Sequence, residues 1–324
     1  MRISSEIEKA LRCPCCSSRL TSGEEFLQCA RPECGTRFVV LGGVPVLLNE
    51  TWGLFSIEDN FRRFSGRQSR YLRLKTFAKR IVPRITTNVA ARRNYSQLAK
   101  MLLNSRENPR VLVIGAGGGG IGVNRLFKDG QIEVVETDVA ISERTHVVCD
   151  AHQLPFANET FDAVIIQAVV EYLQEPGVCV GEIHRVLRTD GMVYSEAPFL
   201  QPVHGREHDF GRFTHVGHRR LYRQFEEISS GVCVGPAAAL ACEIQYFVLS
   251  IFSSKATRDV LKTAVRFGLF WLKYLDYLLI HNRGAIDAAG GTFFLGRKCP
   301  RVMLDREVIA SYKGAVTADG IFLS

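Results

Sequence analysis

Apolar and polar stretches alternate in a repeating strand–turn–helix pattern between residues 110 and 197. Short apolar runs rich in β-branched residues are typical of buried parallel strands. Residues 176–187 instead predict a helix, with Gly191 just past its end as a stop signal. Strands alternating with helices predict an α/β fold with a doubly wound, mostly parallel sheet. The five expected strands are 111–114, 132–136, 146–149, 161–166 and 192–196.

A second apolar region covers residues 241–280. Its charged residues recur at helical spacing as one narrow stripe, so we expect a C-terminal helical cap with most of its surface buried. A cap on the sheet or a homodimer interface is the favoured interpretation, and peripheral contact with a membrane surface is the alternative. Residues 291–298 predict a closing strand. The side chains expected to be buried include Phe267, Phe270, Trp271, Tyr274 and Leu278.

The composition narrows the class of protein. The 324 residues suffice for one large or two smaller domains. We expect no secretory signal, because the first residues are polar and lead into cysteines. We expect no membrane span, because no run of about 18 uncharged apolar residues occurs. Four of the ten cysteines have metal-ligand spacing and most others stand singly, which favours a reducing cytoplasm over an oxidising compartment.

The net charge of +8 is unevenly distributed. Residues 61–110 contain 14 Lys and Arg and one acidic residue, Glu107, so this segment carries +13 and the rest of the chain −5. The pattern predicts a basic helical linker over 51–106. Contact with an anionic partner, such as nucleic acid, lipid headgroups or a phosphorylated substrate, is one interpretation, and a solvated helix face is the other.

Two pairs of cysteines near the N-terminus have the spacing of a metal site. Zinc accepts four thiolates in a tetrahedron, and small modules depend on such an ion to fold. We therefore expect a zinc ribbon over residues 1–50, with Cys15 as an alternative to the second ligand. The expected structural zinc ligands are Cys13, Cys16, Cys29 and Cys34.

This segment resembles the short zinc-ribbon family related to the activator subunit of tRNA and protein methyltransferases. That family usually has two residues between the second pair of cysteines, whereas this chain has four. The residues that carry the resemblance are Leu11, Cys13, Pro14, Cys16, Leu20, Cys29, Cys34, Gly35, Phe38 and the run 43–48.

The apolar run 111–114 breaks directly into the glycine-rich turn GAGGGGIG. Glycines let the backbone turn tightly and approach a ligand, and the N-terminus of a following helix offers free N–H groups. Gly115, Gly117 and Gly120 satisfy the dinucleotide fingerprint, while Gly115, Gly117 and Gly119 satisfy the S-adenosylmethionine version. The glycines alone therefore leave the nucleotide cofactor open.

Downstream motifs are more specific. The segments LPF at 154–156, FD at 161–162 and EIHRVL at 182–187 follow in order. With the glycine turn they resemble class I S-adenosylmethionine-dependent methyltransferases, in particular the methyltransferase type 11 group. The resemblance covers residues 111–198. It implies a Rossmann-like fold and S-adenosylmethionine as the cofactor.

The resemblance also implies roles for individual residues. The turn glycines would lie against the amino-acid part and ribose of the cofactor, and Asp138 would accept hydrogen bonds from the ribose hydroxyls, with Glu136 as the alternative. Only about a dozen residues separate Asp138 from Asp150, which leaves little room for the usual helix between the second and third strands, so the adenine would be held more openly. The residues expected at the cofactor are Gly115, Gly117, Gly119, Asp138, Asp150, Ala151 and Gln167.

The segment after the fifth strand leaves the ligand-binding edge of the sheet and is the natural substrate lid. It contains four of the eight histidines of the chain. His204 or His208 is a candidate general base, and Asp209 a candidate for orienting one of them. Methyl transfer mainly requires an aligned acceptor and exclusion of water.

The sequence thus predicts four parts: a zinc ribbon (1–50), a basic helical linker (51–106), a methyltransferase core (107–240) and a helical cap with closing strands (241–324). We expect a cytoplasmic methyltransferase acting on a small or lipid-linked acceptor of glycan, quinone or natural-product type. The alternatives are an RNA methyltransferase using the ribbon and the basic segment, an NAD(P)-dependent oxidoreductase, and a non-catalytic binding module.

Overall fold

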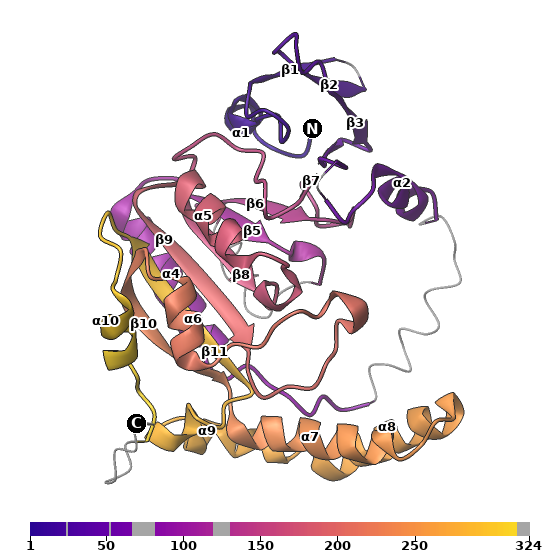
Figure 1. The fold of residues 1–324 in the computed structure, drawn as a ribbon, viewed down its shortest axis with the longest axis vertical. Helices are drawn as coiled ribbons and strands as arrows, with labels where there is room; N and C mark the ends of the chain where they lie inside the picture. The colour runs from indigo at the N-terminus through magenta and orange to yellow at the C-terminus, as the bar shows by residue number, and fades with distance from the viewer. Residues whose placement is uncertain (24, 52, 67–81, 119–129, 316–324) are drawn as a thin grey trace.

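The computed structural model describes residues 1–23, 25–51, 53–66, 82–118 and 130–315 (Figure 1). Its centre is a sheet whose parallel strands lie in the order β7-β6-β5-β8-β9. All five strands were expected, and their bounds differ from the prediction mainly at β9, which begins earlier and includes Gly191. The strands are β5 (Arg110–Ile114), β6 (Glu133–Asp138), β7 (Val147–Cys149), β8 (Phe161–Gln167) and β9 (Leu187–Pro198).

Two antiparallel strands extend the sheet beyond β9. The expected closing strand β11 (Gly291–Lys298) pairs with β9 on one side and with β10 (Phe225–Val234) on the other. The chain reverses direction across the sheet between β5 and β8, which are neighbours. In a doubly wound sheet this reversal opens a crevice at the carboxyl ends of the strands.

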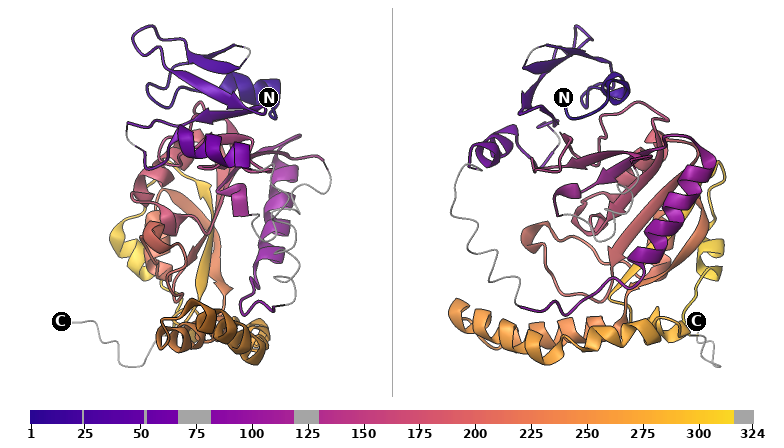
Figure 2. Two further views of the ribbon diagram at one scale, coloured as in Figure 1. Left: turned by 90° about the vertical axis from the view of Figure 1, so that its right-hand side faces the viewer. Right: turned by 180° about the vertical axis from the view of Figure 1, so that it is seen from behind.

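Helices cover both faces of the sheet (Figure 2, left view). Alternate residues of β5 point to opposite faces, so Val111 and Val113 pack in one cluster and Leu112 and Ile114 in the other. Helix α4 (Ala91–Ser105) covers the first face and α5 (Pro176–Val186) the second. Helix α4, expected within the linker, is therefore part of the core.

The cysteine-bearing unit continues the same sheet. Its strands are β1 (Leu20–Ser22), β2 (Phe26–Cys29), β3 (Arg37–Leu41) and β4 (Val44–Leu47). Strand β4 pairs in parallel with β7, through Val46 with Val148 and Leu47 with Cys149. After helix α1 (Ser5–Ala10), Leu11 bridges Phe156 of the LPF segment, and both side chains are fully buried. The LPF segment thus holds the ribbon against the core.

Residues 139–146 contain no helix between β6 and β7. Elements from earlier in the chain occupy that side of the sheet instead. In helix α2 (Ile57–Gly66), Asn60 Nδ2 donates to the Val139 carbonyl at 3.1 Å, and its Oδ1 accepts from Ile141 N at 2.7 Å. Ile141 packs with Val44 and Val46 of β4. The ribbon and α2 therefore cover the space that a helix would otherwise fill.

The C-terminal region is helical, as expected, but the predicted burial was wrong. Helices α7 (Pro236–Ser250), α8 (Lys255–Leu269) and α9 (Asp276–Leu279) run along the lower end of the molecule (Figure 1). The exposed fractions are 50% for Phe267, 51% for Trp271, 55% for Tyr274 and 73% for Leu278. The helical periodicity was real, but no element of the described chain packs over this face. Among the described residues, no helix is both long and apolar enough to cross a membrane.

Candidate active site

The carboxyl ends of the five parallel strands open into a cavity of about 1080 Å³. Each strand end contributes to its wall, which places it in the crevice expected for a doubly wound sheet. Following the sheet from β7 to β9, the lining residues at the strand ends are Asp150, Asp138, Gly115, Gln167 and Glu196.

The start of the glycine turn requires glycine at two positions. Gly115 has φ +77°, and a Cβ there would lie 2.2 Å from Val169 Cγ2. A Cβ on Gly117 would lie 2.7 Å from Asp138 Oδ2, the oxygen that accepts a hydrogen bond from Gly117 N at 2.8 Å. Because these two glycines have no side chain, the turn can lie directly against the end of β6. Gly119, Gly120 and the helix expected after them lie outside the described residues.

Asp138 and Glu136 have different surroundings. Asp138 lines the cavity, and backbone N–H groups of Gly117 and Ala140 fix its two oxygens. Each oxygen keeps an acceptor position for a further donor. Glu136 is buried outside the cavity lining and is paired with Arg144, whose Nε lies 3.0 Å from Glu136 Oε1. The geometry favours Asp138 for contact with a diol.

At the β7 end, Asp150 and Ala151 line the cavity beside His152. Asp150 Oδ1 accepts from His152 N at 2.9 Å and lies 2.6 Å from His152 Nδ1. Burial raises the pKa of Asp150, but the hydrogen bonds from His152 outweigh it and lower the pKa below its usual value. Asp150 is thus held as a carboxylate.

The ribbon side closes this end of the cavity. Leu48, Leu54 and Phe55, which follow β4, line the wall near Asp150 and Ala151. The chain after the ribbon therefore supplies a wall at this end of the cavity, which the short connection after β6 did not predict.

Glu196 was not predicted as a site residue. It is fully buried at the β9 end of the cavity, and burial raises its pKa. Its oxygens accept from Gln167 Nε2 at 2.7 Å, Asn88 Nδ2 at 2.7 and 2.9 Å, and Tyr194 Oη at 2.5 Å. The sequence did offer one indication of this role, because Glu196 stands at the carboxyl end of a predicted strand. The network joins Gln167, an expected cofactor residue, to the far end of the cavity.

The three predicted catalytic residues do not line the cavity. Asp209 accepts from Arg212 and from the backbone N–H groups of His204 and Gly205, which lower its pKa. His204 Nε2 lies 3.6 Å from Glu171 Oε1, and its Nδ1 lies 3.1 Å from the Pro202 carbonyl. The buried Glu171 raises the pKa of His204. His204 and Asp209 therefore hold the loop in shape.

His208 differs from the other two in its neighbour. It is exposed, and its ring centroid is 6.4 Å from that of Phe55, which lines the cavity. It is thus the predicted catalytic side chain that contacts a cavity-lining residue across from its loop.

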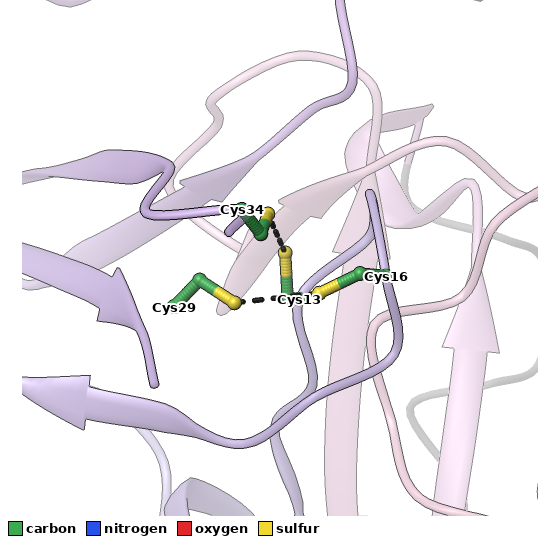
Figure 3. Close-up of side chains that lie close together, drawn as sticks. All are labelled: Cys13, Cys16, Cys29 and Cys34. Carbon is green, nitrogen blue, oxygen red and sulfur yellow. Dashed lines mark hydrogen bonds between the residues drawn. The ribbon is translucent and has the colours of Figure 1, made fainter. Parts of the chain in front are cut away.

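The four expected zinc ligands converge in the ribbon (Figure 3). Their Sγ atoms all lie within 4.8 Å of one another, with 3.8 Å between those of Cys13 and Cys34 and 3.4 Å between those of Cys16 and Cys29. Zn–S bonds of about 2.3 Å in a tetrahedron require sulfur separations of about 3.8 Å. Cys15 is exposed and lies outside the cluster. The donor set fits a structural zinc ion held by the four predicted cysteines.

Residues 112–195 match the sequence family described as a methyltransferase domain. No curated protein sequence matches the chain.

Solved structures with a similar arrangement include three methyltransferase-related proteins. A putative sarcosine dimethylglycine methyltransferase from Galdieria sulphuraria is 16% identical over 65% of this chain and 87% of its own (TM-score 0.43). A chain from the complex of the Haloferax volcanii Trm112 methyltransferase activator with a putative methyltransferase is 16% identical over 65% and 92% (TM-score 0.39). Phosphoethanolamine N-methyltransferase 2 of Haemonchus contortus, in complex with S-adenosyl-L-methionine, is 16% identical over 63% and 52% (TM-score 0.39).

The family match identifies residues 112–195 as a methyltransferase domain. The match favours a methyltransferase over the oxidoreductase considered above.

Removing zinc should destabilise the ribbon. It should also weaken cofactor binding, because the chain leaving the ribbon forms one wall of the cavity. We expect about one zinc ion per chain by elemental analysis, and a lower melting temperature and a weaker calorimetric affinity for S-adenosylmethionine after chelation. Cys29→Ser should lose zinc, whereas Cys15→Ser should retain it. Equal zinc content in both variants would contradict this assignment.

Asp138→Ala should weaken S-adenosylmethionine binding by roughly tenfold or more, the loss expected for charge-assisted hydrogen bonds. Titration calorimetry measures the affinity directly. The matched control is Glu133→Ala, because Glu133 is a carboxylate of the same strand outside the cavity lining. An Asp138→Ala affinity equal to that of the control would remove Asp138 from the cofactor site.

His204 should stabilise the fold mainly when protonated. Its pKa is raised, so the stabilisation is complete below the unfolded value near 6.5 and is lost as the pH rises through the folded pKa. The melting temperature of His204→Gln should fall further below that of the unmodified protein at about pH 6 than at about pH 9. A difference independent of pH would exclude the pair with Glu171.

Proposed function

We propose that the enzyme transfers the methyl group of S-adenosylmethionine to a small or lipid-linked acceptor, of glycan, quinone or natural-product type. The observation that carries this proposal is the cavity itself. Its volume of about 1080 Å³ slightly exceeds the roughly 300–1,000 Å³ usual for one bound small molecule. It therefore has room for a cofactor and a compact acceptor together.

The cofactor end of the cavity is assigned from its polar groups. Asp138 would accept from the ribose hydroxyls, and Asp150 and the Ala151 backbone would face the adenine edge, with Leu54 and Phe55 against the ring. Gly115, Gly117 and Gly119 would lie along the ribose and amino-acid part, with Gln167 beside the methionine portion. When bound, S-adenosylmethionine supplies an electrophilic methyl group, so the protein has chiefly to align the acceptor.

The acceptor end is assigned to the side of Glu196. This buried carboxyl group accepts hydrogen bonds from Asn88, Gln167 and Tyr194, so it orients these three side chains. His208 at the rim is the candidate for removing a proton from an acceptor, while His204 and Asp209 position the loop that carries it.

The main alternative is an RNA acceptor. The basic segment 61–110 favours it, and Arg84 of that segment lines the cavity. The binding of RNA by such a segment would fall steeply with added salt, because Lys and Arg displace counterions from phosphates.

We propose a reducing location such as the cytoplasm. The support is that all ten cysteines are free in the structure, and four of them have metal-ligand spacing.

Transfer of a labelled methyl group to fractionated cell extract tests the acceptor class. We expect label in the lipid or small-molecule fraction, with His208→Ala reducing the rate by about a hundredfold if a proton must be removed. The matched control is His281→Ala, a histidine far along the chain from the loop. Label recovered in RNA, with salt-sensitive RNA binding, would replace the small-acceptor proposal by the alternative.

A further inference from the structure

Residues 255–280 form a helical segment whose outer side carries an apolar stripe, called here the α8 stripe. The residues between α8 and α9 keep right-handed helical dihedral angles, so the turns follow one another along the segment. Members of the stripe are separated by four, three, four, three and four residues, and all are exposed. This alternation is the spacing of the a and d positions of a heptad repeat. The α8 stripe consists of Val260, Ala264, Phe267, Trp271, Tyr274 and Leu278.

Every charged residue of this segment lies away from the stripe. With the stripe at a and d, all seven charged residues of 255–280 occupy b, c and f, the positions that face away from a partner helix. Positions e and g flank such a seam and often carry charges, but between 260 and 278 they are uncharged. The side that a neighbouring helix would contact is therefore free of charge. The flanking residues are Leu261, Thr263, Gly268, Phe270, Leu275 and Tyr277.

Contacts with the rest of the protein use the other side of the segment. Arg266 Nε donates to Gln245 Oε1 of α7 at 2.9 Å. Lys273 Nζ donates to the Arg84 carbonyl at 2.6 Å. Both Arg266 and Lys273 are at c positions, so the segment packs on its own protein without using a or d. The α8 stripe is thus left open in the described part of the chain.

The charges separate the surfaces that such a stripe could join. Helices that lie on a membrane are rich in Lys and Arg on their polar face. Here the exposed charges of residues 236–280 balance, with Lys255 and Lys262 against Glu243 and Asp259. The two lysines are at f, opposite the stripe. An uncharged seam with heptad spacing is instead typical of a helix that packs on another helix.

The α8 stripe is complementary to itself when two copies run antiparallel. With a two-fold axis level with residue 269, each member faces another member of the stripe. Phe267 faces the partner's Trp271, and Ala264, the smallest member, faces the partner's Tyr274. Trp271 Nε1 already donates to the Gly268 carbonyl of its own helix at 2.9 Å, so its ring brings no unsatisfied N–H into a dry contact. The pairing therefore matches small with large side chains and buries no charge.

The exposed area is large enough for a stable dimer. The large side chains of the stripe, with the flanking Leu275 and Tyr277, are 41% to 73% exposed. At roughly 150–250 Å² for a large side chain, they leave about 700 Å² per copy in water. Two copies would bury about 1,400 Å², within the roughly 1,200–2,000 Å² of a stable protein interface.

We infer that a second copy of this chain binds the α8 stripe, with the two helices antiparallel about a two-fold axis. Closed pairing of one surface with itself is the commonest form of oligomer. Phe267 and the partner's Trp271 lie nearest the axis, where aromatic side chains contribute most to binding. No residue of the stripe lines the cavity, so the inference does not rest on the proposed function.

Analytical ultracentrifugation of the full chain tests the interface without measuring activity. We expect a dimer that dissociates on dilution. F267K and W271E should each raise the dissociation constant by about tenfold or more, because each places an unpaired charge in an apolar seam. The matched control I309K changes a similarly exposed residue of α10 (Asp305–Ala310) and should dimerise as the unmodified chain does. Melting temperatures close to that of the unmodified chain show that the variants are folded.

Mixing the two variants tests the direction of the helices. In the antiparallel pair, the lysine of F267K faces the glutamate of W271E, and the second Phe267–Trp271 contact is unchanged. We therefore expect the mixture to dimerise more tightly than either variant alone. A parallel pair would bring position 267 against 267, so mixing would create no ion pair.

Four outcomes would overturn the inference. They are an unmodified chain that stays monomeric at all concentrations, a dimer that neither F267K nor W271E weakens, a mixture no tighter than its components, and a monomer that sediments with vesicles of phosphatidylcholine and phosphatidylglycerol. The last would make a membrane the occupant of the stripe instead of a second copy.

Discussion

The parallel pairing of β4 with β7 determines much of this structure. Two residue pairs, Val46 with Val148 and Leu47 with Cys149, join the cysteine-bearing unit to the edge of the methyltransferase sheet. The contact of Leu11 with Phe156 fixes the same unit from a second side. Because the chain then leaves β4 directly over the strand ends, the position of the cavity wall depends on this pairing.

The pairing explains how the sheet is covered although the connection after β6 is short and has no helix among the described residues. The resemblance implies a helix between β6 and β7, and the described residues 139–146 contain none. Here β4 and α2 provide the cover, and the following residues Leu54 and Phe55 reach the cavity. The cysteine-bearing unit and the cavity are thus parts of one packed unit, and the four-cysteine cluster supports the wall indirectly.

Local patterns allowed most of the core to be predicted. Apolar runs marked all five parallel strands, and the glycine turn with Asp138 marked the strand ends where the cavity lies. Glu196 and Phe55 were missed as cavity residues because their roles depend on contacts across the sheet, which spacing along the chain does not reveal. The burial of Phe267 and Trp271 was wrong for a related reason: periodicity defines two faces of a helix but not which face the protein covers.

One amide side chain serves two neighbours. Asn88 Oδ1 accepts from Ala90 N and Ala91 N at the start of α4, while Nδ2 donates to both oxygens of Glu196. Aspartate would cap the helix equally well but would place a second anion against a buried one, and serine would be too short to span the gap. The identity of this residue is therefore dictated by a double requirement, which makes position 88 far less tolerant of exchange than an ordinary capping position.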